Sequence, residues 1–223
     1  MNKLITIYVL NKKQNSSLFI LSILSIILLL LRVKITHSIY LLFLLWNLFL
    51  ALIPYSISSY IKFDFSIKRS NLKNLIYLII WLLFIPNTFY LITDFVHLHH
   101  NNLLQYIFDF TLLSSFTIAG FYFGILSIHD IHKLVKSIYS RRVSNAFIIS
   151  ISYLCAFGIY LGRILRFNSW DIVSNPSNLF YSILDCLFEI ETIIFTLSFG
   201  SLILISYSIT YQLTLKNKLH EKY

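Results

Sequence analysis

The sequence predicts an all-α protein, an integral membrane bundle of about six transmembrane helices. Of its 223 residues, 57% are hydrophobic and only 12% are charged, whereas a soluble domain carries about 25% charged residues. The mean hydropathy is +0.76, and the apolar runs approach the ~20 residues that a helix needs to cross a ~30 Å hydrocarbon core. These runs lack strand-like alternation, which leaves a helical bundle as the structure that satisfies its backbone in lipid.

Six apolar runs are long enough to span a bilayer, and together they predict a single transmembrane domain over residues 1–223. The expected spans are about 16–33, 38–60, 72–93, 106–128, 145–166 and 180–211. The first run is short, so Arg32 and Lys34 are expected to extend toward the membrane interface. No small-x-small cleavage site follows this run, which predicts a retained anchor. The last run is too long for one straight span, and its opening after Asn175-Pro176 is expected to form an interfacial turn or a short helix before membrane entry near Cys186.

Lys and Arg are distributed unevenly among the segments that join these runs. With six spans, 14 of the 18 Lys and Arg residues lie on the side of the two termini, and 4 lie on the opposite side. Because basic residues favour the cytoplasmic side, both termini are expected to be cytoplasmic. The same distribution accounts for the net charge of +9 without a nucleic-acid partner, so the expected partner is the lipid bilayer.

Polar residues follow Pro86 at the outer end of the third run: Asn87, Tyr90, Asp94 and His97. Their spacing of 3, 4 and 3 would place all four on one narrow face of a continuous α-helix. Pro86 removes a backbone donor and is expected to kink that helix. A kinked helix with a polar stripe suits a binding cleft, whereas a stripe of interhelical hydrogen bonds would have only a structural role. Both interpretations stay open at this point.

The fifth run ends in a dense group of charged, amide and aromatic side chains. These are Arg163, Arg166, Asn168, Trp170 and Asp171, and they directly follow Gly158 and Gly162. The glycine pair, like Gly120 and Gly124 in the fourth run, is a pattern that lets two helices approach closely. The two arginines lie about one turn apart and can grip a phosphate or carboxylate. They can equally pair with acids expected on the same side of the membrane, which include Asp94, Asp171 and Glu189.

Two polar residues inside the apolar runs need partners. Glu189 is expected to face the bundle interior with Arg163 or Arg166 as its partner, because an unpaired charge inside the bilayer costs about 3 kcal/mol. Asn47 in the second run needs an interior partner for the same reason.

A metal site is the lesser hypothesis. Asp94 and His97, with His99 and His100 in the following loop, offer oxygen and nitrogen ligands. No established ligand-spacing motif accompanies them. A divalent metal therefore stays a minor alternative at Asp94 and His97, and no metal or other cofactor is assigned.

Three motifs are distinctive when taken together. They are Trp46-Asn-Leu-Phe-Leu-Ala-Leu-Ile-Pro54; Pro86-Asn87 with Tyr90, Thr93-Asp94 and His97; and Gly158-x-Tyr-x-Gly-Arg163 with Arg166, Asn168 and Trp170-Asp171. They resemble the bacterial membrane family called domain of unknown function 1361, over nearly the whole chain. One departure is Thr88-Phe89, where members usually have a small residue and a proline. The resemblance implies a small polytopic protein of the bacterial cell membrane and brings no mechanism with it.

The leading functional hypothesis is binding or transport of an anionic small molecule or lipid head group. The expected site is a polar cleft on the extracytoplasmic side, formed by the ends of the third, fifth and sixth spans. One alternative is a membrane enzyme acting on a lipid-linked or cell-wall substrate, with Asp94 or Asp171 as general base and His97 as base or metal ligand. The other is a structural subunit of a membrane assembly.

Overall fold

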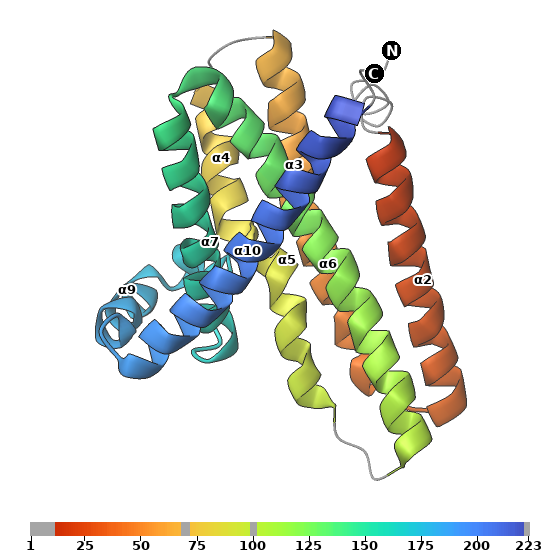
Figure 1. Cartoon of the computed structure of the whole chain (residues 1–223). Coiled ribbons are helices and arrows are strands. Elements are labelled where there is room, and N and C mark those ends of the chain that lie inside the picture. Colours follow the sequence, from red (N-terminus) through yellow and green to blue (C-terminus); the bar gives the residue numbers. More distant parts are fainter. Residues whose placement is uncertain (1–11, 68–71, 99–101, 221–223) are drawn as a thin grey trace. The chain divides into compact units, whose positions relative to one another are not determined.

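A computed structural model of the chain describes residues 12–67, 72–98 and 102–220. This part of the chain is helical, and six of its helices are long and apolar enough to cross a membrane (Figure 1). Many large apolar side chains on these helices are exposed, as lipid-facing side chains of a membrane protein are; Phe19 is 65% exposed and Leu104 is 77% exposed. The prediction of an all-α, multi-pass membrane protein is therefore confirmed.

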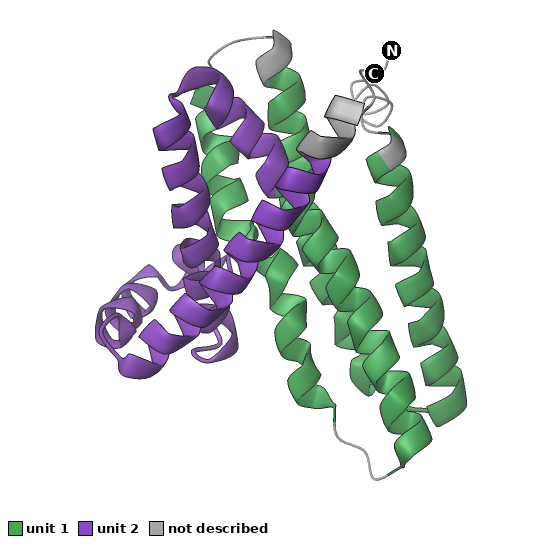
Figure 2. Cartoon of the chain, in the orientation of Figure 1, with its two compact units in different colours: residues 1–127 green, residues 128–223 purple. Residues whose placement is uncertain are grey.

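The contacts of the chain divide it into two compact units (Figure 2). Unit 1 comprises residues 1–127 and unit 2 comprises residues 128–223. The elements up to the boundary are α2 (Lys12–Thr36), η1 (Tyr40–Leu42), α3 (Phe43–Ile67), α4 (Leu72–Phe84), α5 (Pro86–Tyr90), η2 (Leu91–His97) and α6 (Leu103–Ile138). The elements after it are α7 (Arg141–Arg163), α8 (Asp171–Ser174), α9 (Pro176–Cys186) and α10 (Ile190–His220). The boundary between the units therefore falls inside the continuous helix α6.

The third apolar run is interrupted where proline predicts an interruption. Helix α4 ends at Phe84, and α5 begins at Pro86, because the proline ring has no N–H and clashes with the preceding turn. From Leu91 the chain continues as the 3₁₀ helix η2, which has about three residues per turn. The prediction that four polar residues share one face of a continuous α-helix is therefore wrong. Within η2, Asp94 and His97 still share a face, because they are three residues apart.

The other ends of the apolar runs differ from the expected ones in two places. The last run, predicted over 180–211 with membrane entry near Cys186, forms two helices, and its membrane-spanning part begins at Ile190. The short helix expected after Asn175 is α9, which begins at Pro176. Helix α6 continues to Ile138, well past its predicted end at residue 128. The polar residues after that point therefore belong to a helix and not to a loop.

Glycine allows close helix packing in both units. In unit 1, a Cβ atom at Gly120 would lie 2.7 Å from the carbonyl oxygen of Thr88, and one at Gly124 would lie 2.6 Å from the ring of Phe89. The predicted packing role of the Gly120 and Gly124 pair in α6 is thus confirmed. In unit 2, the corresponding contact joins α10 to α7: a Cβ atom at Gly200 would overlap the ring of Tyr153.

Candidate functional site

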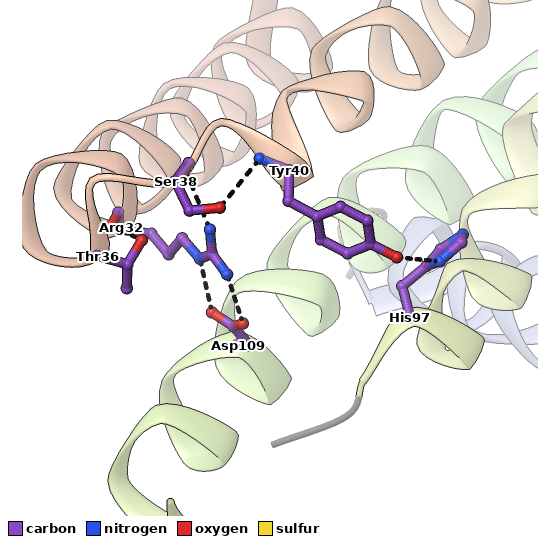
Figure 3. A network of polar contacts seen from close by, with 6 residues as sticks. All are labelled: Arg32, Thr36, Ser38, Tyr40, His97 and Asp109. Carbon is purple, nitrogen blue, oxygen red and sulfur yellow. Dashed lines mark hydrogen bonds and ion pairs between the residues drawn. The ribbon is translucent and has the colours of Figure 1, made fainter. Parts of the chain in front are cut away.

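A buried ion pair lies at one end of unit 1 and joins α2 to α6 (Figure 3). The Nε and Nη2 atoms of Arg32 each donate to a carboxylate oxygen of Asp109, both at 3.2 Å. The Nη1 atom of Arg32 donates to the carbonyl oxygen of Ser38 at 3.1 Å. Both charged side chains are only 3% exposed. The expectation that Arg32 extends to the interface is therefore wrong, because a two-bond carboxylate contact holds its guanidinium inside the bundle.

His97 belongs to the same polar end of unit 1. Its Nδ1 atom lies 2.9 Å from the hydroxyl of Tyr40 in η1 (Figure 3). Its ring also packs edge-on against Phe43, with the two ring centroids 5.1 Å apart. These contacts tie the last residue of η2 to the beginning of α3. One nitrogen of the imidazole is therefore already engaged by the protein.

Asp94 is fully buried, at 0% exposure. The Nδ2 atom of Asn47 in α3 donates to its Oδ2 atom at 2.9 Å. The expectation that Asn47 finds an interior partner is confirmed, and that partner is one of the predicted site residues. A carboxylate in this position connects α3 to η2 and has no exposed surface to offer to a substrate.

Asn87 and Tyr90 lie in the short helix α5. The Nδ2 atom of Asn87 donates to the carbonyl oxygen of Phe84 at 3.0 Å, across the helix interruption at Pro86. Tyr90 is the last residue of α5 and is half-buried. The predicted polar stripe is thus divided: Asn87 stabilises the interruption, while Asp94 and His97 contact α3 and η1.

The metal hypothesis receives no support from this geometry. Within residues 12–67, 72–98 and 102–220, no three His, Cys, Asp or Glu side chains are placed to hold a metal ion. His99 and His100, the other predicted ligands of that region, lie outside the described residues.

The predicted arginine site lies in unit 2, in the loop that leaves α7. Arg163 is the last residue of that helix and is half-buried. Arg166 is exposed, and its backbone is left-handed, with φ of 61°. The N–H of Phe167 donates to the carbonyl oxygen of Leu161 at 3.0 Å, which folds the loop back onto the helix end. The left-handed position after a helix is usually occupied by glycine.

Asp171 closes this loop at the beginning of α8. It accepts hydrogen bonds from the backbone N–H of Asn168 at 2.6 Å and from the hydroxyl of Ser174 at 3.0 Å. The Asn168 N–H foremost, and the Ser174 hydroxyl in addition, lower the pKa of the Asp171 carboxyl below its ordinary value. Trp170, just before it, is 44% exposed. The loop is therefore held in shape by its own residues, with Arg166 and Trp170 exposed.

Glu189 is not placed as expected. It lies in the turn between α9 and α10, where its N–H donates to the carbonyl oxygen of Cys186 at 3.0 Å. Its side chain is exposed and forms no ion pair with any residue that the structure describes. The expectation of an inward-facing glutamate paired with an arginine is wrong, because the helix on which that orientation was based is interrupted at this residue.

The predicted cleft would combine residues of both units, since its third-span residues precede Ser127 and its arginines follow it. The union of the two halves in one cleft stays a prediction.

A second group of buried polar residues, which no sequence pattern singled out, lies in unit 2 between α6 and α10. His129, Asp130 and His132 are 7%, 3% and 5% exposed. The Nδ1 atom of His132 lies 2.5 Å from the hydroxyl of Tyr207, and the ring of Tyr207 stacks on that of Tyr211. The sequence that forms this group is His129-Asp-Ile-His-Lys133. It resembles a polar loop if the fourth span is taken to end at residue 128.

Comparison with known protein families matches residues 46–206 to a family described as protein of unknown function (DUF1361). That match covers well over half of the chain. Neither the curated proteins nor the solved structures contain a match to this sequence.

Proposed function

Because the chain belongs to the DUF1361 family of proteins of unknown function, its role has to be inferred from its own residues, and we propose that it binds an anionic small molecule or lipid head group. The proposed site is the loop from Arg163 to Asp171. The activity would be binding, or binding as one step of transport. The distribution of Lys and Arg supports a site on the extracytoplasmic face of a bacterial cell membrane, with both termini in the cytoplasm.

The observation that carries this proposal is the backbone of Arg166. A left-handed conformation costs a residue with a Cβ atom about 1–2 kcal/mol, and glycine would avoid that cost. Strained backbone of this kind is concentrated at functional sites. Arg166 nevertheless occupies the position, with its side chain exposed and in no ion pair with a described residue. An exposed arginine that occupies a strained backbone position, with no ion pair to a described residue, is available for a ligand.

The chemistry of the loop favours an anion. A guanidinium group presents paired N–H donors that match a phosphate or carboxylate. Arg163, at the end of α7, adds a second positive charge nearby in the sequence, and Asn168 contributes an amide. Trp170 is half-exposed and suits the head-group region of a membrane. Because Asp171 already holds the loop in shape, little conformational entropy is left to lose on binding.

Binding is favoured over catalysis by the state of the acids. Asp94 is buried and hydrogen-bonded to Asn47, so a substrate has no access to its carboxylate. The lowered pKa of Asp171 makes it a weak base near neutral pH, where an effective general base has a pKa closer to 7. The contributions of Tyr90, His97 and Glu189 to a ligand site stay predictions.

The substitution Arg166→Gly tests the proposal, because it removes the guanidinium and at the same time relieves the left-handed backbone. We expect the affinity of the full chain for inorganic phosphate or for glycerol phosphate, measured by calorimetry in phosphatidylcholine nanodiscs, to fall about tenfold or more, which is the loss of one charge-assisted hydrogen bond. The free energy of unfolding should be unchanged or up to about 1 kcal/mol higher. Binding of glycerol phosphate but not of inorganic phosphate would identify a lipid head group as the ligand.

His37→Gly is the matched control. His37 is the other described non-glycine residue with a positive φ, 52°, and it lies just after α2 in unit 1. This variant should show the same small change in stability and the affinity of the wild type for both probes. Wild-type affinity in Arg166→Gly, or binding of neither probe by the wild type, would refute the proposal.

A further inference from the structure

An apolar groove of about 550 Å³ runs between α2 and α3 in unit 1. Its walls include Leu18, Phe19 and Ile26 of α2 and Leu48 and Leu52 of α3. The volume lies within the range of about 300–1,000 Å³ that is typical of ligand sites. Both helices are candidate membrane spans, so the groove is in the part of the protein that lipid surrounds.

The length of the groove is comparable to the depth of one leaflet of a bilayer. The lining residues extend from Asn15 to Ile26 along α2 and from Leu45 to Tyr60 along α3, which is about 16 Å and about 22 Å at a helical rise of 1.5 Å per residue. The hydrocarbon core is ~30 Å thick, so these lengths correspond to about half to three quarters of it. An acyl chain of a membrane lipid has the shape, the polarity and the length to lie in such a groove.

One end of the groove is polar. The hydroxyl of Tyr55 in α3 donates to the Oδ1 atom of Asn15 in α2 at 2.6 Å. Ser59, one turn further along α3, also lines the groove, and it is 5% exposed. Its hydroxyl is buried and has no hydrogen-bond partner among the described residues. A buried hydroxyl without a partner costs about 1–3 kcal/mol, and a polar group of a bound molecule would remove that cost.

Positive charge lies at the same end. The Nζ atom of Lys73 donates to the hydroxyl of Tyr60 at 2.7 Å, and Tyr60 lines the groove. Asp64 interacts electrostatically with Lys73 and offsets part of its charge. Lys12 is exposed, and it precedes Asn15 by one helical turn, which places both on one side of α2. A phosphate group at this end would therefore meet a net positive environment.

From these four features we infer that the groove binds a phospholipid: one acyl chain lies between α2 and α3, and the phosphate lies at the end marked by Asn15 and Ser59. The two lysines give the site a preference for an anionic lipid over a zwitterionic one. With the N-terminus in the cytoplasm, this lipid belongs to the cytoplasmic leaflet, which carries the anionic lipids that attract basic residues. The site is separate from the arginine loop, and neither proposal depends on the other.

Ser22→Trp tests the groove, because Ser22 lines it on α2 and an indole ring would fill it. We expect native mass spectrometry of the full chain with added phosphatidylglycerol to show an affinity about tenfold or more below that of the wild type. Leu24→Trp is the matched control, since Leu24 is on the same helix, is 49% exposed and is not part of the groove lining. It should bind phosphatidylglycerol as the wild type does.

Further results decide the inference. Equal lipid affinity in Ser22→Trp and Leu24→Trp, with both variants folded, would overturn it, and so would a wild-type dimer that Ser22→Trp dissociates, since a second copy would then occupy the groove. If Ser22→Trp does not fold, Ile26→Trp replaces it.

Lys12→Gln should lower the preference for phosphatidylglycerol over phosphatidylcholine, and an unchanged preference would refute the phosphate position. Arg166→Gly should bind phosphatidylglycerol in the groove normally, and Ser22→Trp should bind inorganic phosphate normally.

Discussion

In unit 1 the principal buried polar contact carries two full charges, since Arg32 donates twice to Asp109. In unit 2 the corresponding buried contact joins an imidazole and a phenol, His132 and Tyr207, and the charged Lys136 beside them is exposed. A buried ion pair cannot lose one member without leaving a charge in a low-dielectric environment. A buried pair of uncharged groups loses only a hydrogen bond. The two units should therefore respond to the loss of one partner by very different amounts.

The largest effect is expected at the ion pair. Asp109→Leu leaves the Arg32 guanidinium buried without its counter-charge, which costs about 3–5 kcal/mol. The measurement is the free energy of unfolding of the full chain in a denaturing-detergent titration.

The double variant Arg32→Met with Asp109→Leu is the control for this prediction. Replacing a buried ion pair by apolar side chains of similar volume is often neutral or stabilising, so most of the lost stability should return. If the double variant is as unstable as the single one, the contribution of the pair is packing and not charge.

A smaller effect is expected at the uncharged pair. Tyr207→Phe removes the hydroxyl that lies 2.5 Å from Nδ1 of His132, and leaving one buried polar atom without its partner costs about 1–3 kcal/mol. The same titration measures it. Tyr211→Phe, which removes only the exposed contact with Lys136 at 3.0 Å, should cost less. A loss in Tyr207→Phe that equals that of Asp109→Leu would remove the contrast between the units.

The smallest effect is expected at Asp171, on the exposed loop of unit 2. Its pKa is lower in the folded chain than in the unfolded one, so its carboxylate stabilises the fold above the unfolded value of about 3.9. That contribution is lost as the pH falls through the folded pKa. Asp171→Asn should therefore lower the thermal unfolding temperature slightly at neutral pH, with the difference from the wild type disappearing in acid.

Asp185, an exposed acid of α9 in the same unit, is the control for this pH dependence. The side chain of Asp185 lacks the loop contacts of Asp171, so Asp185→Asn should keep the unfolding temperature of the wild type at neutral pH. A difference between wild type and Asp171→Asn that grows toward acid pH would contradict the assigned hydrogen bonds.

Local patterns predicted the parts of this fold that depend on neighbouring residues. Apolar runs predicted the helices, Pro86 the interruption, and the Gly120 and Gly124 pair the close packing of α6. The need of Asn47 for an interior partner followed from its position inside an apolar run. These features share one cause: each is determined by residues within a few helical turns, through their solvation or through backbone sterics.

Contacts between distant segments could not be predicted in the same way. Arg32 and Asp109 are 77 residues apart, and nothing local to either residue selects the other. The polar end of α6 was missed for a different reason. Hydropathy indicates where an apolar segment ends and not where its helix ends. The continuation of α6 with His129 and Lys133 therefore resembles a loop. The predicted orientation of Glu189 is wrong because the chain has no proline at the interruption before α10, so the sequence does not indicate that interruption.

The course of α6 through the unit boundary also bears on how this protein can be divided for experiment. A fragment that ends at Ser127 would end in the middle of a helix and leave up to four backbone carbonyl groups without partners. The exposed residues Tyr139 and Ser140, between α6 and α7, are the nearer place to open the chain, because a break there costs no helical hydrogen bond. Two fragments divided at this turn, produced together, would each retain whole helices.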